Sequence, residues 1–177
     1  FDPYESHRYR MEAEKTFEKS GNVVLYRFAT AFGLSPRLRL DLLANDFCFQ
    51  AVNNGNLIIY QKDVRRTFIH VRDIARALLH AVENFKKMKN NIYNVGHESL
   101  NLTKKDLVEK VQEYHPKLYV HYADIGQDPD QRDYEVSYAK IRGTGFETTI
   151  TLDQGIKEMI KAFPSIKLHN PHSNFQG

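Results

Sequence analysis

The sequence has 177 residues, of which 41% are hydrophobic and 27% charged, and this balance excludes an intrinsically disordered chain. The formal net charge of +3, from 25 basic and 22 acidic residues, is too small to indicate a nucleic-acid-binding protein. The single cysteine, Cys48, excludes a disulfide framework and favours a reducing compartment, which we expect to be the cytoplasm. No apolar run approaches the roughly 20 residues that span a bilayer, so we expect no membrane partner.

The first third of the chain predicts a helix, a buried strand, a loop and a second helix. Residues 5–19 mix charged and apolar side chains and end before Gly21, which is typical of an exposed helix. Residues 23–28 form a largely apolar run, as expected for a strand buried in a parallel sheet. We expect a loop over 30–39 and a helix over 38–52.

The remaining elements alternate between strands and helices, and this alternation predicts an α/β fold. Thr103 followed by Asp106 has the spacing of a capping box at the start of a helix. The predicted elements are a strand over 57–60, a strand over 67–71, a helix over 72–85, a strand over 91–95, a helix over 104–113, an extended segment over 119–122, a polar loop over 124–132, a short helix over 138–142 and a last helix over 154–163.

Five short motifs then stand in a definite order. They are Met11–Lys15, Tyr26–Gly33, Arg66–Ala75, Tyr93–Gly96, and Arg132-Asp133-Tyr134 with Ser137 and Lys140-Ile141 behind it. In this order the chain resembles the second half of the extended short-chain dehydrogenase/reductase family, the NAD(P)-dependent nucleotide-sugar epimerases and dehydratases. The resemblance runs from residue 3 to about residue 163.

The glycine-rich phosphate turn that opens such folds is absent from the sequence. None of the nine glycines forms a G-x-x-G-x-x-G or G-x-G-x-x-G spacing. The resemblance implies NAD or NADP as the cofactor, but its cradle is not in this chain. The chain also lacks an initial Met, so we expect it to be the second part of a longer protein.

The resemblance also implies a division into two parts and a partner. Residues 1–34 and 64–96 would belong to a Rossmann-type layer, and residues 35–63 and 97–177 to a smaller substrate lobe. Family members often pair two helices per subunit in a dimer, and the helix over 5–19 would be one of them, so a homodimer is expected.

Two arginines are predicted to bind the substrate, a nucleoside diphosphate-sugar. A guanidinium presents a planar fork of donors that fits phosphate oxygens. By resemblance, Arg66 at the start of a buried strand and Arg132 in the polar loop hold the pyrophosphate. The alternatives are a surface arginine at a strand start for Arg66, and an ion pair with Asp130 or Asp133 for Arg132.

Four further residues are candidates for substrate contacts. Ile58 and Tyr60 share one strand face and could sandwich the nucleoside base, although an ordinary core position is the alternative. Thr30 follows a buried strand at its carboxyl end, where open α/β sheets usually place ligand contacts. Asn45 is a weaker candidate, with a polar helix surface as the alternative.

The catalytic pair of the family is altered. The family uses a Tyr and a Lys four residues apart on one helix, and aligning Met11 with its motif places Ser6 and Arg10 at these positions. No Tyr-x-x-x-Lys occurs in the chain; Tyr4 and Arg8 have the spacing but are shifted by two residues. A serine hydroxyl has a much higher pKa than a phenol, so the usual acid/base step is in doubt.

Three hypotheses remain open. The chain is the substrate-binding half of an epimerase, dehydratase or reductase, a relative that binds nucleotide-sugars without turnover, or an inactive fragment. His70, inside a predicted strand, is expected to be structural, and the other histidines show no metal-ligand spacing.

Overall fold

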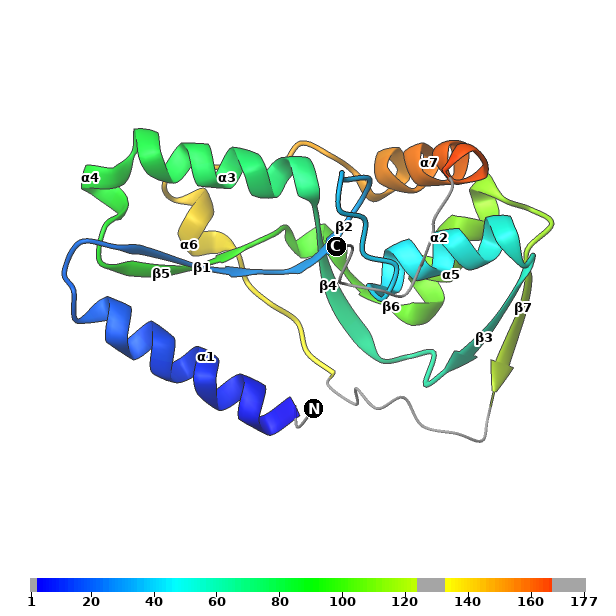
Figure 1. Ribbon diagram of the computed structural model, residues 1–177, viewed down its shortest axis with the longest axis horizontal. Helices are drawn as coiled ribbons and strands as arrows, with labels where there is room; N and C mark the ends of the chain where they lie inside the picture. The colour runs from blue at the N-terminus through cyan, green and yellow to red at the C-terminus, as the bar shows by residue number, and fades with distance from the viewer. Residues whose placement is uncertain (1–2, 124–132, 167–177) are drawn as a thin grey trace.

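Figure 1 shows the computed structural model of the chain, which describes residues 3–123 and 133–166, with side chains from residue 8 onward. The α/β class is confirmed. None of the helices in these ranges is long and apolar enough to cross a membrane. The elements in order are α1 (Pro3–Glu18), β1 (Val24–Phe28), β2 (Thr30–Phe32), α2 (Leu43–Asn53), β3 (Asn56–Tyr60), β4 (Arg65–His70), α3 (Val71–Glu83), α4 (Phe85–Met88), β5 (Asn91–Val95), η1 (Glu98–Leu100), β6 (Asn101–Thr103), α5 (Lys104–Tyr114), β7 (Tyr119–Ala123), α6 (Ala139–Arg142), α7 (Leu152–Ala162) and η2 (Phe163–Ser165).

The described strands form three small sheets. β1 pairs with β5 in parallel, β2 pairs with β4 in parallel while β6 joins β4 antiparallel, and β3 pairs with β7 in parallel. Only Ala29 separates β1 from β2, and its N–H donates to the carbonyl of Val95. The chain therefore passes from the first sheet into the second almost without a break.

The first sheet lies between helices, as Figure 1 shows, with α3 above the β1–β5 pair and α1 below it. Tyr26 of β1 donates its hydroxyl hydrogen to the carbonyl of Ala77 on α3, at 3.0 Å. The apolar cluster beneath α3 also takes in residues 136–146. Its buried members are Ala29, Ile69, Ala77, Met88, Tyr93, Val95, Tyr138, Ile141 and Phe146.

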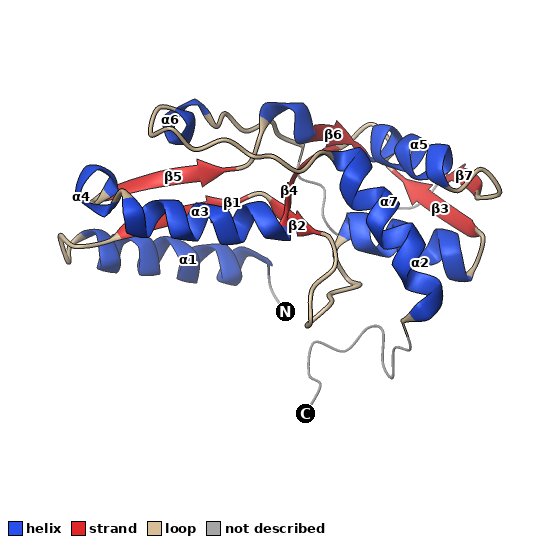
Figure 2. Cartoon of the chain, turned by 90° about the horizontal axis from the view of Figure 1, so that it is seen from above, coloured by secondary structure: helices blue, strands red, loops and turns tan. Residues whose placement is uncertain are grey.

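A second and larger core lies where α2, α5 and α7 meet, beside the β3–β7 pair (Figure 2). Phe32 and Phe68 pack edge to face in it, with ring centroids 6.4 Å apart. α5 and α7 each begin with a complete capping box, at Thr103 and Thr151, so backbone donors in their first turns are satisfied locally. The predicted capping box at Thr103 is confirmed.

Several boundaries differ from the sequence prediction, most of them by one or two residues. Residues 30–32 were predicted as loop but form β2, because they pair with β4. β4 begins at Arg65 rather than at residue 67, since β6 pairs with its first residues. α2 begins at Leu43 rather than at residue 38, and α3 begins at Val71. The carbonyl of Arg39 accepts a hydrogen bond from the Asn45 side chain, so this stretch serves as a loop held by the helix.

Candidate functional site

Arg66 lies within β4 and is 6% exposed. Paired residues of neighbouring strands point to the same face, so Thr30, which pairs with Phe68, shares a face with Arg66. Arg66 precedes Phe68 by two residues, which is roughly 7 Å along a strand. The structure therefore brings Thr30 and Arg66 to one face of the β2–β4 sheet. One nitrogen of the guanidinium, Nη1, donates to the carbonyl of Arg65 at 2.8 Å.

Arg65 points to the opposite face and ties a distant segment to β4. The carboxylate of Asp133 accepts a hydrogen bond from the backbone N–H of Arg65 at 2.9 Å, and Glu135 forms an ion pair with its guanidinium. The N–H and side chain of Arg65 hold the pKa of Asp133 below its usual value. These contacts of Arg65 were not predicted from the sequence. Arg132, the neighbour of Asp133 in the sequence, lies outside the described residues.

Asn45 is buried on α2 and holds the loop that follows β2. Its Oδ1 accepts from the backbone N–H of Gly33 at 3.0 Å, and its Nδ2 donates to the carbonyl of Arg39 at 2.8 Å. The polar helix surface offered as its alternative is wrong, because the side chain is 2% exposed. These bonds order the loop over 33–39 beside Thr30.

Ile58 and Tyr60 lie on the open face of β3, at 55% and 38% exposure. They share that face as predicted, and the core alternative is wrong, because the alternate residues Leu57 and Ile59 fill the core instead. The buried ammonium of Lys104 donates to the carbonyl of Tyr60 at 3.0 Å. The sequence analysis did not single out this lysine. The available signal was its position as the first residue of α5, directly after the N-cap Thr103.

The predicted catalytic positions lie on α1. Arg10 is exposed, and for Ser6 the structure describes only the helical backbone. α1 is joined to β1 by a double hydrogen bond from Arg27 to Glu14, at 2.9 and 2.6 Å. The positions predicted for the catalytic pair are therefore on a helix attached to the first sheet.

His70 has a structural role, and its close packing explains why two neighbouring positions are glycine. Its Nδ1 accepts a hydrogen bond from the N–H of Arg72, which caps α3, and its ring packs edge to face on Phe32. A Cβ at Gly33 would lie 2.4 Å from the ring, and one at Gly155 would lie 3.0 Å from it. Both glycines are therefore required by the close packing around this histidine.

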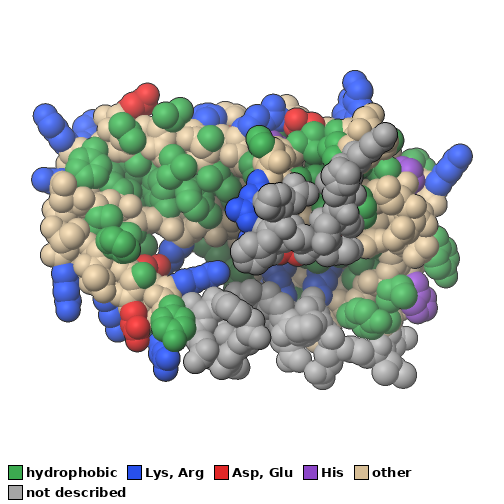
Figure 3. Space-filling model, in the orientation of Figure 1, with side chains coloured by type: hydrophobic (Ala, Val, Ile, Leu, Met, Phe, Trp, Pro, Cys, Tyr) green, Lys and Arg blue, Asp and Glu red, His purple; other side chains and the backbone are tan. Residues whose placement is uncertain are grey.

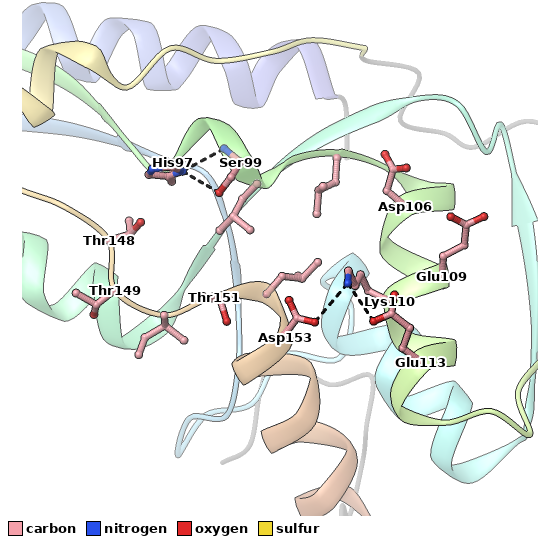
Figure 4. A pocket seen from close by; sticks show the side chains of 14 residues that line it. His97, Ser99, Asp106, Glu109, Lys110, Glu113, Thr148, Thr149, Thr151 and Asp153 are labelled. Carbon is pink, nitrogen blue, oxygen red and sulfur yellow. Dashed lines mark hydrogen bonds and ion pairs between the residues drawn. The ribbon is translucent and has the colours of Figure 1, made fainter.

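A cavity lined by other residues lies elsewhere, and Figure 4 shows it from close by. It has a volume of about 650 Å³ and is lined by η1, α5 and residues 148–153. Four carboxylates face it with one ammonium, Lys110, which pairs with Glu113 and Asp153. This charge disfavours a diphosphate. None of the six predicted site residues with described side chains lines it.

Solved structures of similar fold support this arrangement of elements. The RMD protein of Pseudomonas aeruginosa, solved with NADPH, matches 88% of this chain and 54% of its own at 19% identity, with a TM-score of 0.73. The dTDP-glucose 4,6-dehydratase of Bacillus anthracis, solved with NAD, matches 93% of this chain and 53% of its own at 22% identity, also with a TM-score of 0.73. The UDP-glucose 4-epimerase of Thermus thermophilus, solved with NAD, matches 87% and 51% at 17% identity, with a TM-score of 0.70. The chain spans about half the length of these proteins.

The amino-acid sequence of the chain also matches a family model. The model of the NAD dependent epimerase/dehydratase family matches residues 2–96, which is more than half of the chain and includes α1, Thr30 and Arg66. The chain therefore belongs to the NAD-dependent epimerase/dehydratase family.

Proposed function

We propose that this chain is the substrate-binding half of an NAD(P)-dependent epimerase, dehydratase or reductase, and that it binds a nucleoside diphosphate-sugar. Arg66 and Arg132 hold the pyrophosphate, Ile58 and Tyr60 contact the base, and Thr30 contacts the sugar phosphate. Residues 35–63 and 97–177 serve as the substrate lobe, and residues 1–34 and 64–96 as part of the Rossmann layer.

The position of Arg66 is the observation that carries the proposal. A nearly buried guanidinium on a rigid strand is pre-organised to bind an anion, since little side-chain freedom is lost on binding. Thr30 lies on the same face and could donate its hydroxyl hydrogen to a second phosphate oxygen. Asp133, the neighbour of Arg132 in the sequence, is anchored to Arg65 of the same strand.

The open face of β3 supports the contact with a base. Ile58 and Tyr60 offer an aliphatic and an aromatic surface to solvent, two residues apart on one face. A flat base stacked on them would cover apolar area that is otherwise exposed. Asn45 contributes by holding the loop over 33–39, and its direct contact with substrate stays a prediction.

The cofactor of the family does not fit the residues of this chain alone. A dinucleotide cradle needs glycines whose backbone approaches a pyrophosphate. The space beside these glycines is instead filled by side chains: that of His70 at Gly33, that of Tyr138 at Gly96, and that of Phe32 at Gly155. NAD or NADP would have to be held by residues that the sequence does not contain.

Binding without turnover is the second candidate, and the altered pair on α1 favours it. Ser6 and Arg10 replace the usual Tyr and Lys, and a serine hydroxyl is a weak acid at neutral pH. The double variant Ser6→Tyr with Arg10→Lys, assayed with added NAD or NADP, tests this candidate: a gain of sugar-nucleotide turnover would contradict binding without turnover and support an enzyme site that is otherwise intact.

A homodimer through α1 is also part of the proposal. Tyr9, Met11 and Phe17 are 58%, 44% and 56% exposed on this helix, which gives it apolar surface for a partner helix. Phe17→Glu should convert a dimer into a monomer in light scattering, whereas a monomeric unmodified chain would contradict the dimer.

Thermal melting with a panel of nucleoside diphosphates and nucleotide-sugars tests the proposed function. A ligand at 100 times its dissociation constant adds about 2.7 kcal/mol of stability, which raises the melting temperature measurably. We expect a rise with one base, its loss in Arg66→Ala, and its retention in Arg39→Ala, whose arginine pairs with the nearby Asp41. If no diphosphate raises the melting temperature of the folded chain, the proposal fails and the inactive fragment is favoured.

A further inference from the structure

Lys104 is a buried lysine at a position where the helix itself disfavours a positive charge. The residue is 3% exposed and is the first one of α5. Lysine is almost never fully buried, and cations are favoured at the C-terminal end of a helix rather than in its first turn. Residues that break a local rule in this way are often functional ones. A negatively charged ligand beside the ammonium would offset the electrostatic cost.

Lys104 lies beside Arg66 on one face of the β4–β6 pair. Arg66 pairs with Leu102 in the antiparallel register, and Lys104 follows Leu102 by two residues. The backbone N–H of Lys104 donates to the carbonyl of Val64 at 3.2 Å, so the pairing of the two segments continues to this residue. Diagonal neighbours across two antiparallel strands lie about 7–8 Å apart, within reach of long side chains. The structure therefore brings a second buried cation next to Arg66.

Two buried cations this close repel each other, and the repulsion is stronger inside a protein than in water. A phosphate group between them attracts both, because it accepts hydrogen bonds from an ammonium as well as from a guanidinium. Figure 3 shows Lys and Arg side chains in the middle of the molecule, where β4 lies, as well as around its rim. Lys104 and Arg66 are therefore suited to hold neighbouring phosphates of one ligand.

The bond from Lys104 to Tyr60 orients the ammonium toward the proposed contact with the base. Nζ of Lys104 donates to the carbonyl of Tyr60 at 3.0 Å. Tyr60 is the last residue of β3, whose open face carries that contact, whereas Arg66 lies on the following strand, β4. In a nucleoside diphosphate, the phosphate attached to the ribose is the one nearer to the base. The ammonium is therefore placed for this inner phosphate, and the guanidinium of Arg66 for the outer one.

We propose that Lys104 holds the inner phosphate of the nucleoside diphosphate-sugar, while Arg66 holds the outer phosphate. This inference rests on the proposed function and adds to it a residue and an order of contacts along the ligand. Each phosphate of the pyrophosphate then has a cation of its own. A nucleoside monophosphate should bind through Lys104 without the help of Arg66, whereas the diphosphate needs both.

The alternative is that Lys104 serves only to join α5 to β3. Loss of that bond would disturb Tyr60, and with it the contact to the base, so the nucleoside and its phosphates would all bind more weakly. Loss of a phosphate contact leaves the affinity for the nucleoside unchanged. The affinity for the nucleoside alone therefore separates the two roles.

Isothermal titration calorimetry on the 177-residue chain tests the inference with adenosine, guanosine, cytidine, uridine and thymidine, each also as its monophosphate and diphosphate. Lys104→Gln removes the charge but keeps an amide donor for the carbonyl of Tyr60. For the base that binds, we expect Lys104→Gln to lose about tenfold or more in affinity for the monophosphate and the diphosphate, and Arg66→Ala to lose as much for the diphosphate only. Lys105→Gln is the matched control, because this lysine follows in the same turn with a side chain that is 46% exposed, and it should bind all three ligands like the unmodified chain.

A second measurement does not depend on how well Lys104→Gln folds. In the chain labelled with nitrogen-15 lysine, the Nζ signal of Lys104, assigned from its loss in Lys104→Arg, should shift when the monophosphate is added and stay in place with the nucleoside. A signal that does not move, an unchanged affinity of Lys104→Gln for the monophosphate, or an equal loss for the nucleoside overturns the role of Lys104. If the diphosphate still depends on Arg66 in that case, the proposed function stands. A folded chain that binds none of the nucleotides overturns both.

Discussion

Asp73 is the buried carboxylate through which α3 holds the segment leading into α7, and its removal is the sharpest test of how the two parts of the fold are joined. The side chain is 0% exposed. It accepts hydrogen bonds from the N–H groups of Thr149 and Ile150 at 3.0 and 2.9 Å, and from the hydroxyl of Thr149 at 3.1 Å. Arg76 donates to it at 2.6 Å.

The expected cost of Asp73→Ala follows from these partners. Two backbone N–H groups would lose their acceptor, and each buried unsatisfied donor costs about 1–3 kcal/mol. Arg76 is 44% exposed in its side chain and can be rehydrated, so the lost ion pair adds little. We therefore expect the free energy of unfolding to fall by about 3 kcal/mol.

Thr149→Val is the matched control, because it removes the hydroxyl but keeps both backbone donors paired with Asp73. It should cost about 1 kcal/mol, since the bond of the hydroxyl to Asp73 is lost, while the bond that the hydroxyl accepts from the half-exposed Arg76 can be replaced by water. Urea denaturation followed by circular dichroism measures both variants, with the midpoint expected to move and the slope to stay constant. An Asp73→Ala variant as stable as Thr149→Val would refute the reasoning.

Three other predictions concern packing, acid stability and cysteine reactivity. A Cβ at Gly155 would lie 2.3 Å from an aromatic ring carbon, so Gly155→Ala should cost about 1–3 kcal/mol in urea denaturation, whereas Gly143→Ala, with 3.4 Å to its nearest neighbour, should cost less than half as much; equal costs would contradict this. Arg142 lowers the pKa of Glu98 to about 2, so the stability from their ion pair is complete above the unfolded pKa of about 4.3 and is lost as the pH falls toward 2. The pair is partly exposed, so Glu98→Gln should remove only about 1 kcal/mol at pH 6 and much less at pH 2, where Glu98 is half protonated, and a pH-independent difference would count against the pair. Burial raises the pKa of the Cys48 thiol, so iodoacetamide at pH 8 should label it in urea but not in the folded chain, and rapid labelling without urea would disprove its burial.

The features that the sequence predicted well are local ones. The capping box at Thr103 and Asp106 needs only three residues of separation, and it forms as expected. The shared face of Ile58 and Tyr60 follows from the period of a strand. Such patterns can be predicted from the sequence because the interacting groups lie within one helix or strand or directly beside it.

The features that were missed depend on distant segments. β2 is a strand only because residues 30–32 pair with β4, more than 30 residues further along the chain. Nor did the sequence predict that Asp133 and Glu135 bind Arg65 from a segment 68 to 70 residues away. No periodicity within either segment encodes these pairings, so they emerge only from the tertiary fold.

Binding isotherms for a nucleoside and its diphosphate, measured on the unmodified chain and on Arg66→Ala, test the central claim most directly. If Arg66 holds the diphosphate, the unmodified chain prefers the diphosphate over the nucleoside, and Arg66→Ala loses about 1.5–3 kcal/mol of that preference, the usual value for a hydrogen bond to a charged group. The nucleoside should bind both proteins equally. A diphosphate preference that survives in a folded Arg66→Ala variant would contradict the proposed role of this arginine.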